Sequence, residues 1–366
     1  GPDKWSDSQF REVLKQGLVR SNCNLNFKTD DPNPWMINAD GETVKRQSFH
    51  IPRYLDEAQV NALKSYDGNP GLFEVVYYNE HGYHTWHVKG LCDYNPATLS
   101  LYRRWLESQY GTIAKLNQNH GSEWKSFGEV EPPKQFSGAN SAWFDWMEFR
   151  RYSYGEYLKE AYKLVKPLLP QTRITPKPIN FDYYIASTAN DPWLYRDACD
   201  VFGYDIYPFQ REGYLDPAMS LDFHRTQVGN KDIHFLETNF EFRRPNMTEK
   251  TAADMLLLYW PAFLRGLKGA YFYCWYQGWN ENHRGFWLRE ADGTLTPQGE
   301  GAALVAKTVQ SLAPVLKSGH VQGIKVAIYF PWEDISQIPN TAPVNALYGA
   351  YKMMTQLHYQ IGRAHV

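Results

Sequence analysis

Six short apolar segments recur along the sequence, and helical patterns separate most of them. They are residues 18–27, 72–79, 174–181, 201–207, 233–238 and 270–275. A short continuous apolar run is typical of a strand that is buried on both faces, as in a parallel sheet. Strands that alternate with helices at this spacing belong to α/β folds. The sequence therefore predicts a parallel sheet with helical connections.

Two arrangements of such a sheet are open. A TIM (β/α)8 barrel needs eight strand–helix units, so we expect the first two units to lie upstream of residue 1. A doubly wound open sheet is the alternative, but no glycine-rich phosphate loop follows any of the six segments, which disfavours a nucleotide-binding version. We therefore predict a TIM barrel that is truncated at its N-terminus.

Other elements can be predicted between and beyond these strands. We expect helices at 5–16, 55–66, 96–117, 143–165, 252–267, 302–317 and 344–357, and a loop at 30–41. An additional apolar strand at 323–330 follows the last barrel strand, so we place a domain boundary near residue 318. Residues 1–317 would form the barrel, and 318–360 would begin a second α/β domain. The last six residues, IGRAHV (361–366), match what a common sequencing adapter encodes, and we expect them not to be native protein.

The composition argues against several classes of partner. A formal net charge of −2 and a pI near 6.6 provide no basic surface for nucleic acid or an anionic membrane. No apolar run approaches the roughly 18–20 residues of a membrane span. Aromatic residues make up 16% of the chain, which suits carbohydrate clefts where flat rings stack on sugars. The four cysteines show no CxxC spacing, and we expect Cys199 and Cys274 to be buried free thiols.

Two carboxylic acids, Glu80 and Glu237, each close an apolar strand. Each could be a plain solvent-facing strand end. Together, at the carboxyl ends of parallel strands where barrels keep their active sites, they indicate acid–base chemistry. Retaining glycoside hydrolysis uses two carboxyl groups about 5–5.5 Å apart. Asn79, just before Glu80, fits as a donor to the sugar 2-hydroxyl.

The order of these motifs resembles the retaining (β/α)8 glycosidases and, more narrowly, glycoside hydrolase family 42, the β-galactosidase family. The similarity lies in FEVVYYNE, DVFGYDIYP, HFLETN and GAYFYCWYQ, and most specifically in the stretch YRRWLESQYGTIAKLNQNHGSEWKSFGEVEPP. It covers about residues 18–335. The resemblance implies a retaining exo-β-glycosidase, first of all a β-galactosidase, that needs no cofactor. It also implies a Rossmann-like second domain, a homotrimer and a cytoplasmic enzyme, although the sequence does not exclude a signal peptide.

The resemblance also implies roles for single residues. Glu80 would be the acid/base, Glu237 the nucleophile, and Asn79 the partner of the 2-hydroxyl. Tyr207 would donate a hydrogen bond to Glu237. The residues expected to contact sugar are Trp124, Tyr207, Trp275, Asn280, His283 and Arg46. Structural readings stay open for three of these: Trp275 as barrel core, His283 as a surface loop residue and Arg46 as a solvated charge.

The sequence also departs from the family pattern. The cysteine cluster that binds zinc in the family is absent from EHGYHTWHVKG, which has His81, His84 and His87 instead. No fourth ligand converges with these histidines, so we expect no metal. A family tryptophan is missing after the nucleophile, and Asn280 stands where the family often has Glu. A related β-glycosidase with another sugar specificity, or a non-catalytic carbohydrate-binding barrel, is therefore an alternative.

Overall fold

The computed structural model describes residues 20–23, 25, 27–69, 72–83, 91–179, 188–207, 215–238, 252–275, 287–319, 323–337, 342–359 and 361–364. The chain divides into two compact units. The N-terminal unit comprises Gly1–Pro178, Asp182–Asp200 and Pro331–Pro343. The C-terminal unit comprises Ile179–Phe181, Val201–Phe330 and Val344–Val366.

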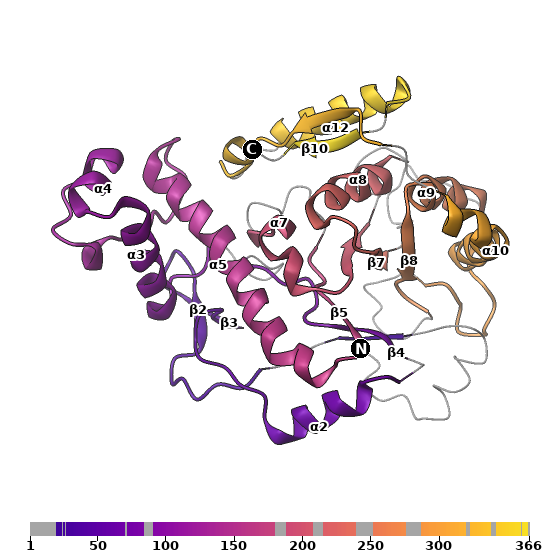
Figure 1. The fold of residues 1–366 in the computed structure, drawn as a ribbon, viewed down its shortest axis with the longest axis horizontal. Helices are drawn as coiled ribbons and strands as arrows, with labels where there is room; N and C mark the ends of the chain where they lie inside the picture. Colours follow the sequence, from indigo (N-terminus) through magenta and orange to yellow (C-terminus); the bar gives the residue numbers. More distant parts are fainter. Residues whose placement is uncertain are drawn as a thin grey trace. The chain divides into compact units, whose positions relative to one another are not determined.

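All six predicted strands form, and they pair in parallel within two three-stranded sheets. The sheet of the N-terminal unit has the order β1 (Arg20–Cys23), β4 (Leu72–Val76) and β5 (Arg173–Thr175). The sheet of the C-terminal unit has the order β6 (Phe202–Ile206), β7 (Ile233–Thr238) and β8 (Leu267–Phe272). Figure 1 labels β4, β5, β7 and β8 among them. Within each sheet, each of the predicted strands pairs with the next predicted strand, and between β1 and β4 the chain adds a separate pair of strands. This is the neighbour order of a (β/α) barrel.

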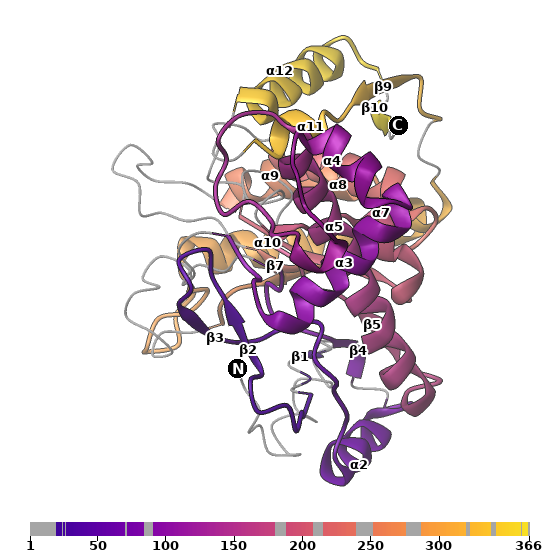
Figure 2. The same ribbon diagram turned by 90° about the vertical axis from the view of Figure 1, so that its left-hand side faces the viewer.

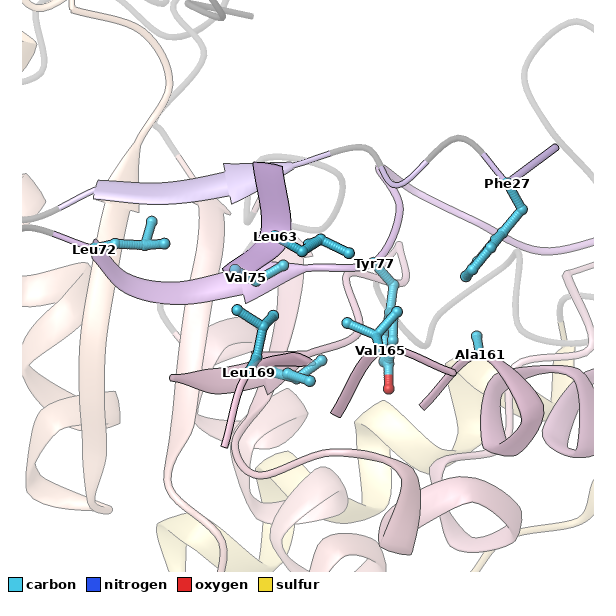
Figure 3. Close-up of a cluster of buried hydrophobic side chains, with 9 residues drawn as sticks. Phe27, Leu63, Leu72, Val75, Tyr77, Ala161, Val165 and Leu169 are labelled. Atoms are coloured by element: carbon cyan, nitrogen blue, oxygen red, sulfur yellow. The ribbon is translucent and has the colours of Figure 1, made fainter. Parts of the chain in front are cut away.

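A hydrophobic cluster fixes β4 against the helices of the N-terminal unit (Figure 3). Leu63 comes from α2 (Glu57–Tyr66), and Ala161 and Val165 come from α5 (Ser141–Val165). Val75 of β4 is 2% exposed and belongs to the same cluster. Each aliphatic side chain buried in this way stabilises the fold by about 1.5–3 kcal/mol. The other members are Phe27, Leu72, Tyr77, Leu169 and Ile174.

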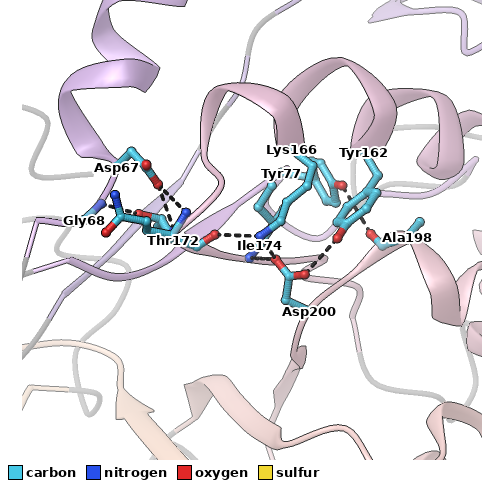
Figure 4. Close-up of polar contacts among 10 residues, drawn as sticks. Asp67, Gly68, Tyr77, Tyr162, Lys166, Thr172, Ile174, Ala198 and Asp200 are labelled. Carbon is cyan, nitrogen blue, oxygen red and sulfur yellow. Dashed lines mark hydrogen bonds and ion pairs between the residues drawn. The ribbon is translucent and has the colours of Figure 1, made fainter.

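Two carboxylates fix the beginning of β5 beside this cluster (Figure 4). Oδ1 of Asp67 accepts hydrogen bonds from the backbone N–H groups of Gln171 and Thr172, at 2.8 and 2.9 Å. Asp200 accepts from the backbone N–H of Ile174 and from Nζ of Lys166, both at 2.9 Å. The register of β5 against β4 therefore rests on side-chain contacts as well as on the sheet ladder.

The region 30–41, expected to be loop, contains part of an antiparallel pair, so that prediction was wrong. β2 (Trp35–Ile37) pairs with β3 (Thr43–Gln47). The polar residues form the turn between them: Oδ1 of Asn38 accepts from the backbone N–H of Glu42 at 2.8 Å, and Gly41 has φ +84°. A polar, glycine-containing stretch of this kind is typical of a tight turn as well as of a long loop, so the sequence pattern does not distinguish the two.

The single helix expected at 96–117 is two helices, α3 (Pro96–Tyr110) and α4 (Ile113–His120). The break falls at Gly111, with φ +70°, and Thr112 caps α4 by accepting from the backbone N–H of Lys115. Figures 1 and 2 show α3 alongside α5. Tyr102 of α3 packs there against Trp146, with ring centroids 5.0 Å apart.

The remaining elements follow the predicted order, apart from several short helices, α8 and β10, none of which was expected. They are η1 (Phe127–Glu129), η2 (Lys166–Leu168), α7 (Pro192–Tyr195), η3 (Arg196–Ala198), α8 (Asp216–Val228), α9 (Ala252–Leu264), α10 (Pro297–Ser318), β9 (Val326–Tyr329), α11 (Trp332–Ile335), α12 (Ala342–Gln356) and β10 (Ile361–Ala364). α9 continues through Pro261, and β9 pairs in parallel with β10. The helix expected at 5–16 lies outside the described residues. The domain boundary near 318, the second domain and the non-native tail stay predictions.

In the part of the chain that the structure describes, no helix combines the length and the hydropathy that a membrane span requires.

Candidate active site

Asn79 and Glu80 follow the carboxyl end of β4 in the N-terminal unit. Val75 and Val76 are buried in the strand, whereas the Asn79 side chain is exposed and Glu80 is partly exposed. The buried amine of Lys177 donates a hydrogen bond to Oδ1 of Asn79 at 2.5 Å. Since the amide oxygen accepts from this cation, the N–H2 group of Asn79 points away from Lys177 and can donate to another acceptor. This is the orientation that a sugar hydroxyl acceptor requires.

Arg46 reaches this strand end from β3. Its Nη1 donates to the backbone carbonyl of Gly82 at 2.8 Å. Burial lowers the pKa of Arg46 below the ordinary arginine value, and nearby groups that include the Glu80 carboxylate partly offset the shift. Arg46 is therefore not a plain solvated charge. Its contact with sugar stays a prediction.

His81 lies among aromatic side chains. Its ring stacks on Tyr78 with centroids 4.1 Å apart, and on Tyr157 at 5.3 Å. Burial, reinforced by the cations Arg46 and Arg53, lowers its pKa well below the usual histidine value. The imidazole is therefore neutral and serves the packing of this strand end. His84 and His87, the other histidines of the triple spacing, lie outside the described residues.

Glu237 stands next to the last residue of β7 in the C-terminal unit, and the structure brings the predicted residue Tyr207 to it. The Tyr207 hydroxyl donates to Oε1 of Glu237 at 2.5 Å. On the neighbouring strand β6, Asp205 is opposite Glu237 in the sheet register. Asp205 is fully buried, and one of its carboxylate oxygens lies within 4.8 Å of one from Glu237.

Cys274 follows β8 and lies in the electrostatic field of Glu237. Burial raises the pKa of its thiol to about 11, and the Glu237 carboxylate adds to the shift. Cys199 is buried, as expected, but Cys274 is partly exposed, so the expectation of full burial was wrong for it. A thiol with so high a pKa is a poor nucleophile at neutral pH.

Four further residues were predicted to contact sugar, and the structure describes two of them, Trp275 and Trp124. Trp275 is 49% exposed, and the guanidinium of Arg289 lies 5.3 Å from its ring centroid, so the reading of Trp275 as barrel core was wrong. Trp124 is partly exposed, and Asn117 fixes its backbone by accepting from its N–H at 3.0 Å and donating to its carbonyl at 2.8 Å. Asn280 and His283 lie outside the described residues.

Sequence reasoning missed Lys177 and Asp205. Each is a charged residue inside a short apolar segment, ITPKPIN or VFGYDIYP. Burying a charge is costly unless it is paired or used, and that is the signal that could have found them. Each unit, taken by itself, therefore presents a carboxylate near the carboxyl end of a strand: Glu80 with the donor Asn79 before it in the sequence, and Glu237 with the donor Tyr207 and a second acid, Asp205, nearby.

The family profile described as β-galactosidase, glycoside hydrolase family 42, matches residues 43–310 of this chain. Among curated proteins, a β-1,2-glucosyltransferase of Ignavibacterium album is 25% identical over 232 residues, which are 57% of this chain and 30% of that protein. The β-galactosidase BgaA of a Planococcus species is 24% identical over 301 residues, which are 75% of this chain and 44% of that protein. The chain thus spans less than half the length of these relatives.

Solved structures show the same fold. A β-galactosidase from Halorubrum lacusprofundi aligns with a TM-score of 0.77 at 18% identity, covering 98% of this chain and 58% of that chain. A β-galactosidase from Marinomonas ef1 aligns with a TM-score of 0.77 at 20% identity, covering 99% and 62%. These likenesses confirm the predicted TIM-barrel fold class. With the family profile matching well over half of its residues, the chain belongs to glycoside hydrolase family 42, the β-galactosidase family.

Proposed function

We propose that the protein is a retaining exo-β-glycosidase, with Glu237 as the nucleophile and Glu80 as the acid/base. Glu237 attacks the anomeric carbon while Glu80 protonates the leaving oxygen, and a glycosyl-enzyme forms on Glu237. Glu80, now ionised, deprotonates the water that attacks the glycosyl-enzyme, and the carboxyl group of Glu80 is restored. The sugar leaves with its anomeric configuration retained.

The contact between Tyr207 and Glu237 carries this proposal. A hydroxyl that donates to a carboxylate oxygen holds the carboxylate in a fixed rotamer, which positions it for attack. The Asn79 amide, oriented by Lys177, supplies the donor that a retaining glycosidase directs at the 2-hydroxyl. Both arrangements lie at carboxyl ends of barrel strands, the side on which barrel enzymes carry their active sites.

The roles proposed for Glu237 and Glu80 do not specify which sugar is removed. Three of the curated relatives are named a β-galactosidase, an exo-β-D-glucosaminidase and a β-1,2-glucosyltransferase, so the names of similar proteins point to more than one β-linked sugar. We propose a terminal β-galactoside as the first substrate to test, and other β-glycosides as alternatives. The predicted homotrimer also stays a proposal.

The test is a panel of nitrophenyl β-glycosides with the wild type, Glu237→Ala and Glu80→Ala. We expect turnover of one sugar by the wild type and a loss of at least about a hundredfold in either variant. Glu160→Gln, which changes an exposed carboxylate on α5, should keep wild-type rates. If either alanine variant matched the wild type, the assigned roles would be wrong. If the wild type bound sugars without turning any over, the non-catalytic alternative would hold.

A further inference from the structure

Glu80 has an unusual backbone conformation. Its φ is +46°, in the left-handed region that residues with a side chain seldom adopt. Such a conformation costs of order 1–3 kcal/mol and persists only where the surroundings hold it. The direction of the Glu80 side chain therefore depends on the contacts that hold this conformation.

Each of the three residues after Glu80 has a backbone hydrogen bond to a distant part of the N-terminal unit. The hydroxyl of Tyr154, on α5, donates to the carbonyl of His81 at 2.8 Å. Arg46, on β3, donates to the carbonyl of Gly82 at 2.8 Å. The backbone N–H of Tyr83 donates to the carbonyl of Thr188 at 3.1 Å. The turn is thus tied to three separate segments.

Close packing restricts the same turn. A Cβ atom added to Gly82 would lie 2.8 Å from Cβ of Thr188 and 2.9 Å from its carbonyl oxygen, so no larger residue fits without a shift of the backbone. The Tyr154 ring also packs against the His81 ring, with centroids 6.0 Å apart and an interplanar angle of 27°. Movement of the turn is therefore opposed by contacts with both Thr188 and Tyr154.

We propose that Tyr154 is a positioning residue for the acid/base: by binding the His81 carbonyl, its hydroxyl fixes the turn that aims the Glu80 carboxyl at the leaving oxygen. This rests on the role proposed above for Glu80. Tyr154 is 1% exposed and belongs to a 25-residue helix, so its hydroxyl is a fixed point. Acid catalysis depends steeply on position, and a misplacement of about 1 Å can cost about a hundredfold in rate.

The test compares two aryl glycosides of the best sugar. A phenyl glycoside needs a proton on its leaving oxygen, whereas a dinitrophenyl glycoside loses its phenolate without one. In Tyr154→Phe we expect kcat/KM to fall about tenfold more on the phenyl glycoside than on the dinitrophenyl glycoside. The matched control is Tyr94→Phe, which removes another tyrosine bond to a backbone carbonyl, that of Pro133 at 2.7 Å. Tyr94→Phe should lower kcat/KM only slightly, and by the same factor on both glycosides.

Gly82→Ala displaces the same turn through the close contact with Thr188 and should show the same selectivity. This second variant provides the test if Tyr154→Phe does not fold. Melting temperatures of all variants identify a general loss of structure. Equal losses on the two substrates in folded Tyr154→Phe and Gly82→Ala, or no loss beyond that of Tyr94→Phe, would overturn the proposal while leaving Glu80 as the acid/base. If Glu80→Ala itself showed no preference for the dinitrophenyl substrate, the assignment of Glu80 would fail, and the positioning role with it.

Discussion

The hydroxyl of Tyr207 donates a hydrogen bond to Oε1 of Glu237 at 2.5 Å. Tyr207 directly follows β6, and Glu237 is the second-last residue of the neighbouring strand β7. The pairing of two parallel strands therefore brings a donor to a carboxylate 30 residues away. The bond fixes one oxygen of the proposed nucleophile.

Tyr207→Phe should lower kcat by about ten- to a hundredfold, because a hydrogen bond to a charged group contributes about 1.5–3 kcal/mol. Steady-state kinetics on the best aryl glycoside would measure it. Tyr259→Phe is the control, since the Tyr259 hydroxyl bonds Thr238 at 2.7 Å, directly after the nucleophile position. Tyr259→Phe should lower the melting temperature but leave kcat close to the wild-type value. Equal kcat values in Tyr207→Phe and wild type would contradict the role of this bond.

Lys177→Met should impair Asn79 without removing it. With Nζ gone, the Asn79 amide is free to rotate and its N–H2 group is no longer directed at the sugar. We expect kcat/KM to fall about tenfold on the ordinary glycoside, and much less on the 2-deoxy glycoside, which lacks the hydroxyl that Asn79 would bind. A loss of the same size on both substrates would show that Lys177 acts on folding alone.

Stability should fall on mild acidification because buried histidines are neutral in the fold. Burial lowers the pKa of His50 to about 3, with a further contribution from Arg53. Between about pH 6.5 and pH 3 the unfolded chain therefore binds a proton that the folded chain does not, and the free energy of unfolding falls by about 1.4 kcal/mol for each pH unit. Urea unfolding near pH 7 and near pH 5 measures this slope. His50→Gln should flatten it, and an unchanged slope in that variant would contradict the account.

A buried carboxylate ties α12 to α8 in the C-terminal unit. Asp222, 2% exposed, accepts from Arg265 Nε at 3.0 Å and from the Tyr351 hydroxyl at 2.6 Å, and also contacts Arg225. Asp222→Asn should cost about 1.5–3 kcal/mol of stability, because the partly buried guanidinium groups of Arg225 and Arg265 lose a charged hydrogen-bond acceptor.

Tyr351→Phe removes only the hydroxyl and should cost about 1.5–3 kcal/mol. Tyr359→Phe, at a side chain that is 47% exposed, is the control and should cost almost nothing. Thermal unfolding would show both results, and a Tyr351→Phe variant as stable as Tyr359→Phe would contradict the network.

The strands that carry the two acids could be predicted because burial on both faces of a parallel sheet requires a continuous apolar run. β4 and β7 have such runs, and the acids follow where each run ends. The pair β2 and β3 could not be predicted in this way, because both strands are short and lack an apolar run. Asn38 and Gly41 marked the polar stretch but did not distinguish a turn from a loop.

The residues that orient the site were harder to predict because their partners are distant in sequence. Lys177 lies 98 positions from Asn79, and Tyr154 lies 73 positions from His81. No local pattern links either pair, and each contact exists only once the strands and α5 have packed. Asp205 could not be assigned to the site for the same reason, because only the register of β6 against β7 places it opposite Glu237.

In the proposed mechanism, Glu237 attacks the anomeric carbon of the sugar. Incubation of the protein with a 2-deoxy-2-fluoro glycoside of its best substrate, followed by mass spectrometry of proteolytic peptides, tests this directly. Fluorine at that position slows both steps, and a good leaving group lets the intermediate form and accumulate. We predict one fluoroglycosyl group, attached to Glu237. Label on another carboxylate, or turnover of the parent substrate with no label at all, would contradict the account.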